Sequence, residues 1–284
     1  MDDAHKDGQS QSMNNPPLHR LNPTPGISAG QHLKRLRRQA GLSQLDLSHL
    51  AGVSQRYLSC VETGRANASP VTLHAILSAL DTPLEHCNAV FLAAGYAPRY
   101  GVSPLDAPAL KMLHAAIEHI LQANNPAPAV VIDSNWDITA ANASAGLLFS
   151  MVGVAAETIS GFNLLETLLS PGGLGDHLAN AQEIRAVAWQ RASREAISNP
   201  KLGLLLKELP VPDALQQDVN PTPLLLTRVN TAHGELRFLS TFTTFGMPQD
   251  ITVESLRIEH LIPADPETWK RMNTAFEQRP LAQR

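Results

Sequence analysis

Apolar residues recur at helical spacing through the first third of the chain, in short runs separated by serine and glycine. Ser43 and Ser54 stand directly before two of these runs, and Gly41, Gly52 and Gly64 stand directly after three of them. A serine side chain accepts hydrogen bonds from the unpaired N–H groups of a helix start, and glycine suits the left-handed residue that ends a helix. The expected helices carry, in chain order, Leu33 and Leu36; Leu45, Leu47 and Leu50; Leu58 and Val61; Leu73, Ile76, Leu77 and Leu80; and the stretch from Pro83 to Ala94. Five short helices in succession predict a compact all-α domain.

The rest of the chain mixes helical with alternating patterns. Leu110, Leu113, Ile117 and Leu121 predict a helix over residues 109–122. Alternating apolar and polar residues predict strands, because successive side chains of a strand point to opposite faces. The expected strands are 129–133, 136–141, 223–230, 235–245 and 256–262, with a turn at His233-Gly234, and the expected helices between them are 142–151, 162–169, 177–198 and 202–209. This order predicts an α+β domain.

These patterns divide the chain into two domains with linking and terminal segments. Residues 1–27 are polar and contain Pro16, Pro17, Pro23 and Pro25, so we expect a disordered tail. The fold class is therefore multi-domain, an all-α five-helix domain followed by an α+β domain. The expected boundaries are 28–98 for the all-α domain, 99–125 for a linker and connecting helix, 126–272 for the α+β domain and 273–284 for a C-terminal tail.

Composition is that of a globular protein, with 43% hydrophobic and 17% charged residues among 284. The two cysteines, Cys60 and Cys87, form neither a disulfide framework nor a zinc pattern, which favours the cytoplasm. We expect no membrane span and no signal peptide, since no long apolar run is present. The net charge of −4 disfavours a uniformly basic chain, but Gly30 to Arg65 holds six basic residues against two acidic ones. This local excess suits phosphate contacts.

The segment from Ser43 to Gly64 has the pattern of two short helices that meet across a tight turn at Gly52. Apolar residues hold the second helix on the core and leave its other face free. Such a face enters the major groove of DNA, where arginine pairs with guanine and glutamine with adenine. A polar residue that opens the first helix, Gln44, can hold a phosphate. The expected DNA contacts are Gln44, Ser54, Gln55, Arg56, Ser59, Cys60 and Arg65.

This segment resembles the Cro and phage-repressor class of helix-turn-helix, called the XRE family, over residues 28–82. The resemblance includes Glu62-Thr63-Gly64-Arg65 and departs from the family at Ser48, where alanine is usual. It implies an ion pair between Arg37 and Glu62 that ties the first helix to the end of the third. The alternative is a helical bundle without a DNA role, which the local positive charge and the motif together disfavour.

The second domain opens with residues 130–138 and Ala141-Asn142-Ala143, which resemble the start of a PAS domain, where a hairpin leads into a helix. Together with residues 93–98, 243–252 and 256–259, this opening resembles the MmyB-like regulators over about residues 30–270. That family joins the helix-turn-helix to a PAS-like ligand-binding domain, and the resemblance implies a fatty acid as ligand. Residues 171–222 match the family less clearly.

An apolar ligand suits the second domain, because leucine and phenylalanine are plentiful and each buried CH₂ contributes about 0.8 kcal/mol. The candidate ligand residues are Phe149, Phe162, Phe238 and Phe242, with Arg228 and Arg237 as receivers of a carboxylate. Alternatively, the phenylalanines are ordinary core and the arginines are surface or ion-paired residues.

We expect a homodimer that reads an inverted repeat in double-stranded DNA, because one recognition helix contacts only a few base pairs. The sequence contains no hydrolase, phosphate-loop or metal-ligand motif, so we expect no enzyme activity, no metal and no cofactor. Three functions remain open at this point. The second domain can be a ligand sensor, a module for dimerisation or protein docking only, or an enzyme with a DNA anchor.

Overall fold

The computed structural model describes residues 27–154, 159, 161–197, 199–216, 224–232 and 234–279 of the chain. Nearly all of the tail expected at residues 1–27 lies outside the described residues, as do His233 of the expected turn and residues 280–284. The chain divides into two compact units between Tyr100 and Gly101.

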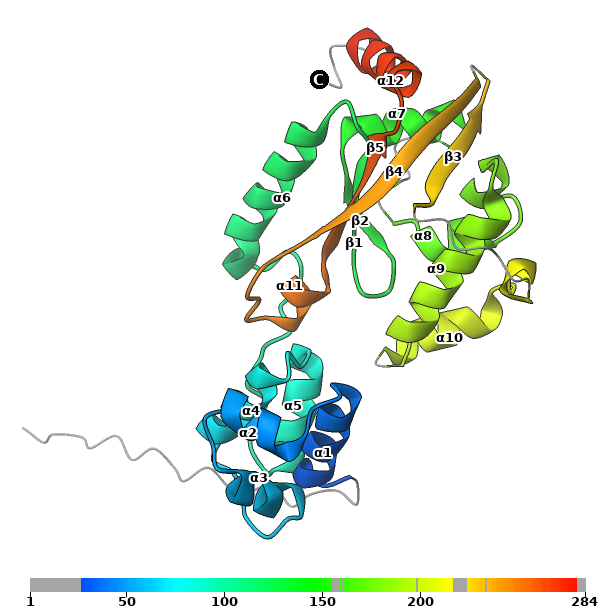
Figure 1. Ribbon diagram of the computed structural model, residues 1–284. Helices are drawn as coiled ribbons and strands as arrows, with labels where there is room; N and C mark the ends of the chain where they lie inside the picture. The colour runs from blue at the N-terminus through cyan, green and yellow to red at the C-terminus, as the bar shows by residue number, and fades with distance from the viewer. Residues whose placement is uncertain are drawn as a thin grey trace, which may run out of the picture. The chain divides into compact units, whose positions relative to one another are not determined.

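The described part of the first unit is built from five helices, as the sequence predicts (Figure 1). They are α1 (Ala29–Gln39), α2 (Gln44–Leu50), α3 (Gln55–Glu62), α4 (Pro70–Ala79) and α5 (Leu84–Ala93). Four of them begin with a serine cap, because Ser28, Ser43, Ser54 and Ser69 each accept a hydrogen bond from the backbone N–H three residues on.

The core of the first unit is formed by side chains from all five helices, among them Leu33, Leu47, Leu58, Ile76 and Phe91, which are buried. One detail differs from the sequence pattern, since Leu45 and Leu50 of α2 are 47% and 63% exposed. The seven-residue helix turns only one narrow side inward, and Leu47 and Ser48 occupy it.

The second unit combines strands and helices, as expected for an α+β domain. Its strands are β1 (Ala129–Ile132), β2 (Ile138–Ala141), β3 (Leu226–Thr231), β4 (Gly234–Thr244) and β5 (Arg257–Pro263). Its helices are η1 (Pro108–Leu110), α6 (Lys111–Asn124), α7 (Ala143–Met151), α8 (Leu164–Leu169), η3 (Leu174–His177), α9 (Ala181–Glu195), α10 (Pro200–Glu208), η4 (Asp213–Gln216), α11 (Ile251–Ser255) and α12 (Pro266–Gln278).

The five strands form one antiparallel sheet in the order β2-β1-β5-β4-β3, which is consistent with the PAS-like expectation. The first hairpin leads into α7 as predicted, and the Asn142 side chain accepts hydrogen bonds from the N–H groups of Ala145 (2.9 Å) and Ala129 (3.0 Å). One asparagine thus caps α7 and ties it to the first strand.

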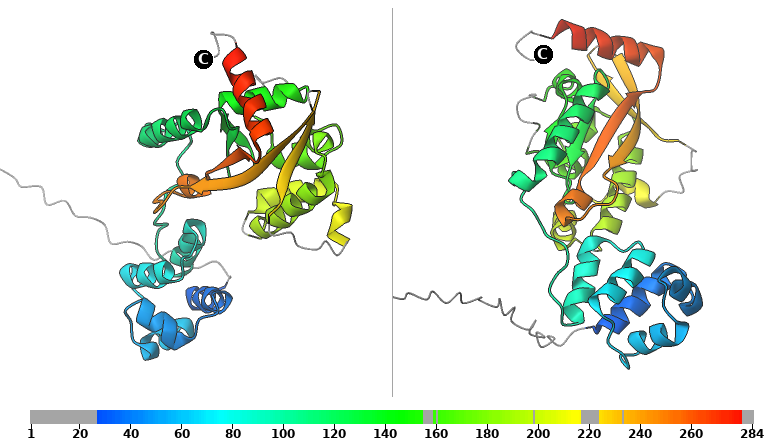
Figure 2. Two further views of the ribbon diagram at one scale, coloured as in Figure 1. Left: turned by 45° about the horizontal axis from the view of Figure 1, so that its top comes forward. Right: turned by 90° about the vertical axis from the view of Figure 1, so that its left-hand side faces the viewer.

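Each sheet face carries its own layer of helices (Figure 2). On one face, which we call the α6 face, Ala129, Val131 and Ile258 pack against Ile117 and Leu121 of α6. On the opposite face, which we call the inner face, side chains of β1 and β2 pack with those of α7, α8, α9 and α10. β1 therefore contributes to both layers through its alternate residues.

The last helix, α12, continues past residue 272, where the sequence pattern ends the domain. Met272 is fully buried and packs with Leu148, Val152 and Leu236, so α12 belongs to the core of the second unit. None of the described helices has the length and apolarity that crossing a membrane requires.

Candidate DNA interface and ligand cavity

The turn between α2 and α3 has the geometry of a helix-turn-helix. Gly52 has a φ of +67°, a left-handed conformation that a Cβ would strain, so glycine is needed there. Ser48 is buried beside the turn, and its hydroxyl donates to the Leu45 carbonyl at 2.8 Å. The small side chain at this position takes little room at the junction of the two helices.

The N-terminal end of α3 presents polar side chains to solvent. Ser54, Gln55 and Arg56 are exposed, whereas Ser59 and Cys60 are half-buried one turn further on. The Ser54 hydroxyl accepts a hydrogen bond from the Tyr57 N–H at 3.2 Å. Among the expected contacts, Gln55 and Arg56 are therefore exposed side chains that take no part in capping the helix, and they can reach base edges.

A buried ion pair holds α1 against the end of α3, at the two residues that the XRE resemblance implies. Arg37 Nε and Nη2 donate to Glu62 Oε1 and Oε2 at 2.6 and 2.9 Å, and Arg37 Nη1 donates to the Leu42 carbonyl at 2.8 Å. The Gln44 side-chain NH₂ donates to the same carboxylate at 2.8 Å. The side-chain amide of Gln44, which was expected to hold a phosphate, therefore donates a hydrogen bond within the protein.

The electrostatics of this pair favour its charged form. Burial opposes ionisation of Glu62, but the hydrogen bonds from Arg37 and Gln44 and the charges of Arg37 and Lys34 outweigh it and lower the pKa of Glu62. The hydrogen bond to Glu62 raises the pKa of Arg37. The free positive charge of the unit therefore comes from residues other than Arg37.

The second unit contains an apolar cavity on the inner face of its sheet. Its volume is about 80 Å³. It is lined by Pro128, Ala129, Val130, Ala145, Leu148, Phe149, Leu164, Leu168, Leu174, Leu178, Ile184, Thr227, Val229, Glu259 and Leu261. Glu259 is the acidic residue in this wall, and its Oε1 accepts a hydrogen bond from the Ser240 hydroxyl at 2.6 Å. The site is thus an almost entirely apolar space with one carboxyl group at its edge.

Comparison with known proteins identifies the two units. Residues 28–89 match a family model for a helix-turn-helix domain. Residues 113–275, more than half of the chain, match the MmyB-like transcription regulator ligand binding domain. The chain belongs to the MmyB-like transcription regulators.

Individual relatives cover less of this MmyB-like regulator. The uncharacterized HTH-type transcriptional regulator y4dJ of Sinorhizobium fredii is 43% identical over 51 residues, which are 18% of this chain and 66% of that protein. The restriction-modification controller protein C.AhdI from Aeromonas hydrophila is 36% identical, with a TM-score of 0.21 over 22% of this chain and 92% of that one. An RNA-binding Light-Oxygen-Voltage receptor is 14% identical, with a TM-score of 0.27 over 89% of this chain and 64% of that one.

Of the six residues that the sequence suggests for ligand binding, Phe149 alone is among the residues that line the cavity of the MmyB-like domain. Phe238 is fully buried and packs with Leu148 and Leu236, and Phe162 packs at the edge of the inner-face core. Phe242 is 43% exposed, and the Arg191 guanidinium lies over its ring. The other three phenylalanines therefore do not line the cavity.

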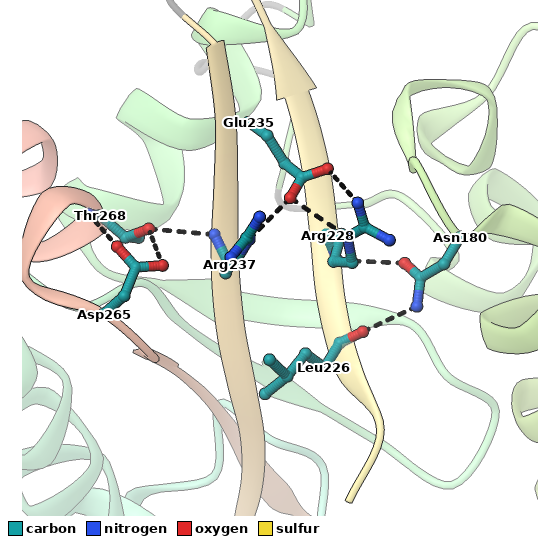
Figure 3. Close-up of polar contacts among 7 residues, drawn as sticks. All are labelled: Asn180, Leu226, Arg228, Glu235, Arg237, Asp265 and Thr268. Carbon is teal, nitrogen blue, oxygen red and sulfur yellow. Dashed lines mark hydrogen bonds and ion pairs between the residues drawn. The ribbon is translucent and has the colours of Figure 1, made fainter. Parts of the chain in front are cut away.

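Arg228 and Arg237 do not face the cavity. The two residues are cross-strand partners on β3 and β4, while their neighbours Thr227 and Val229 line the cavity, so strand alternation directs both arginines to the opposite face. Both guanidinium groups bind Glu235, Arg228 through two bonds of 3.1 and 2.6 Å and Arg237 through one of 2.7 Å (Figure 3). They form a surface ion-pair cluster, which is the alternative that the sequence left open.

The inner face also carries two charged residues, Arg257 and Glu259, that the sequence analysis did not single out. Arg257 and Glu259 lie two residues apart on β5 and are opposite Ile132 and Val130 of β1 in the register. Alternation along residues 256–262 predicts that Arg257 and Glu259 share one face, opposite Leu256 and Ile258, but only the pairing with β1 shows that this face is the inner one.

Proposed function

We propose that this MmyB-like regulator binds an inverted-repeat operator as a homodimer, and that a small apolar ligand, most simply a fatty acid, changes its operator affinity. The protein acts in the cytoplasm and catalyses no reaction. The observation that supports ligand sensing is an apolar cavity inside a domain of a ligand-binding family. The exposed polar end of α3, beside the left-handed turn at Gly52, supports base recognition.

A fatty acid has to enlarge the cavity in order to enter it. Its volume of about 80 Å³ is well below the roughly 300–1,000 Å³ of pockets that hold drug-sized ligands. Side chains of α7, α8 and α9 and of β3 form most of the wall, so an acyl chain must move these elements apart. A ligand that binds one arrangement better than the other shifts the balance between them.

Strand β1 connects the cavity to α6, so a movement of the cavity wall can be transmitted to that helix. Val130 of β1 lines the cavity, whereas its neighbour Val131 packs on α6 through the other face. Asn142 also donates to the Leu121 carbonyl of α6 at 3.2 Å. Since α6 follows the end of the first unit in the sequence, it is the element through which we propose that ligand binding alters DNA affinity.

The test uses the full-length protein, with an operator selected from random DNA. Saturated fatty acids from octanoate to palmitate are titrated calorimetrically, and operator affinity is then measured with and without the tightest binder. We expect affinity to rise with chain length and operator affinity to change about tenfold, a coupling of roughly 1.4 kcal/mol. Absence of binding at every length, or binding that leaves operator affinity unchanged, would leave a domain for dimerisation or docking only.

A further inference from the structure

A cluster of two arginines, one glutamate and one tryptophan lies on the inner face, next to the cavity. Glu195 of α9 accepts hydrogen bonds from Trp136 Nε1 at 2.8 Å, Arg191 Nε at 3.0 Å and Arg257 Nη1 at 3.1 Å. The Trp136 ring has both guanidinium groups over it, that of Arg257 at 4.9 Å and that of Arg191 at 5.6 Å from the ring centre. We call these four residues the Arg257 cluster.

Arg257 is the member of this cluster with unused hydrogen-bonding capacity. It is only 8% exposed, and its Nε and Nη2 are buried with no acceptor in reach among the described residues. These two nitrogens form one edge of the guanidinium plane and point in parallel. A buried charged donor that lacks an acceptor costs free energy, so such an edge calls for a partner.

The same protein shows what this edge binds. Arg37 uses Nε and Nη2 to hold both oxygens of Glu62, and Arg228 uses the same pair of atoms to hold both oxygens of Glu235. A carboxylate matches the spacing of the two N–H groups and accepts two parallel, charge-assisted bonds. Arg257 offers this arrangement without an internal carboxylate on it.

The carboxylate nearest to Arg257 also has other donors to serve. Two guanidinium groups share the single carboxylate of Glu195. Glu259 lies two residues along β5, and burial raises its pKa, against the hydrogen bond from Ser240 and the charges of Arg191 and Arg257. Burial and the charge of Arg191 lower the pKa of Arg257, against the attraction of Glu195, yet an arginine keeps its proton at neutral pH.

The cluster and the cavity adjoin along one strand. Arg257 and Glu259 point to the same face, with Cα atoms separated by two residues or roughly 7 Å, and Glu259 is part of the cavity wall. Phe242, opposite Glu259 in the register, has the Arg191 guanidinium 3.9 Å from its ring centre. An apolar chain in the cavity can therefore end at the cluster.

From this geometry we infer that Arg257 receives the carboxylate of an acidic ligand through its Nε and Nη2 edge, with the apolar part of that ligand in the cavity. The inference rests on the proposed ligand-sensing function and adds the chemistry of the ligand's polar end. Arg257 is then the residue that makes the domain select an acid over a neutral molecule with the same chain.

The test compares decanoate with decanol on the full-length protein by calorimetric titration. The wild-type protein should bind decanoate at least about tenfold more tightly than decanol. Arg257→Gln should remove that preference by weakening decanoate binding and leaving decanol binding unchanged. The exposed Arg194→Gln on α9 is the matched control, because it removes the same charge from the same region, and it should keep the preference.

Arg257→Lys separates charge from geometry, since lysine keeps the positive charge but has no planar edge. It should bind decanoate several-fold more weakly than the wild-type protein, and it decides the question if the glutamine variant does not fold. An unchanged preference in either folded variant would overturn the inference. Equal binding of decanoate and decanol by the wild-type protein would overturn it while ligand sensing stands, and absence of binding by both would overturn the two together.

Discussion

Two arginines, one in each unit, are buried to the same extent, with 8% of each residue exposed. Arg37 places all three of its nitrogens on acceptors, two on Glu62 and one on the Leu42 carbonyl. Arg257 places one nitrogen on Glu195 and leaves its other two without an acceptor in the described structure. Two equally buried arginines can therefore have different roles. Arg37 has all its nitrogens hydrogen-bonded and holds the fold together, whereas Arg257 keeps two donors that we infer bind a ligand.

The largest effect that we predict separates these two residues by stability. Arg37→Met leaves Glu62 buried with only Gln44 as a partner, and losing one half of a buried ion pair costs about 3–5 kcal/mol. Arg257→Met removes one hydrogen bond and two unpaired donors, while Glu195 keeps Trp136 and Arg191. We expect a cost below about 1.5 kcal/mol for this second change.

Urea unfolding of the full chain can measure the two costs separately. All three tryptophans, Trp136, Trp189 and Trp269, belong to the second unit, so their fluorescence reports its unfolding. Circular dichroism and operator binding report the first unit. Arg38→Met, at an exposed position beside Arg37, is the control and should be nearly neutral. Similar losses for Arg37→Met and Arg257→Met would make Arg257 a structural anchor.

The exposed Arg56 extends the comparison of Arg37 and Arg257 to an arginine on the surface. Arg56 is exposed on α3, and the described structure gives its side chain no ion pair or hydrogen bond. We expect Arg56→Ala to leave unfolding unchanged but to weaken operator binding by about 1–3 kcal/mol and to relax the preference at one base pair. Binding assays on the operator and on random DNA check this. Equal losses on both would show that Arg56 contacts only phosphate.

The contrast between the units also explains what the sequence could predict. In the first unit the capping serines and the turn at Gly52 follow local rules, so the helices were correctly predicted from residues a few positions apart. The hydrogen bond from Gln44 to Glu62 joins residues 18 positions apart, and no local rule gives it.

In the second unit the strands were predicted but the faces of their residues were assigned without regard to alternation. Arg237 and Phe238 are neighbours on β4 and cannot both face one cavity, which the sequence alone would have shown. The Arg257 cluster is different in kind. It joins Trp136, Glu195 and Arg257, which lie 59 and 62 positions apart, and only the folded sheet and α9 bring them together.

The smallest effect that we predict concerns two glutamates, the buried Glu62 and the half-buried Glu259, whose pKa values move in opposite directions. The folded pKa of Glu62 lies below its unfolded value, so its stabilising contribution is present above the unfolded pKa and is lost as pH falls through the folded one. The folded pKa of Glu259 lies above its unfolded value. Its contribution is therefore present below the unfolded pKa and is lost as pH rises through the folded one.

Glu259→Gln should accordingly flatten the pH dependence of the second unit, because glutamine can keep a hydrogen bond with Ser240 and carries no charge to desolvate. Each unit of pKa difference between folded and unfolded chains corresponds to about 1.4 kcal/mol. At pH near 8 the variant should be at least as stable as the parent, and that advantage should vanish as pH falls toward the unfolded pKa of glutamate. Tryptophan-monitored urea unfolding across this range measures it, with the exposed Glu166→Gln as control. Parallel profiles for parent and variant would mean that folding leaves the pKa of Glu259 unshifted. A parent that gains stability over the variant as pH rises would mean that Arg191 and Arg257 stabilise the Glu259 carboxylate, as Arg37 stabilises that of Glu62.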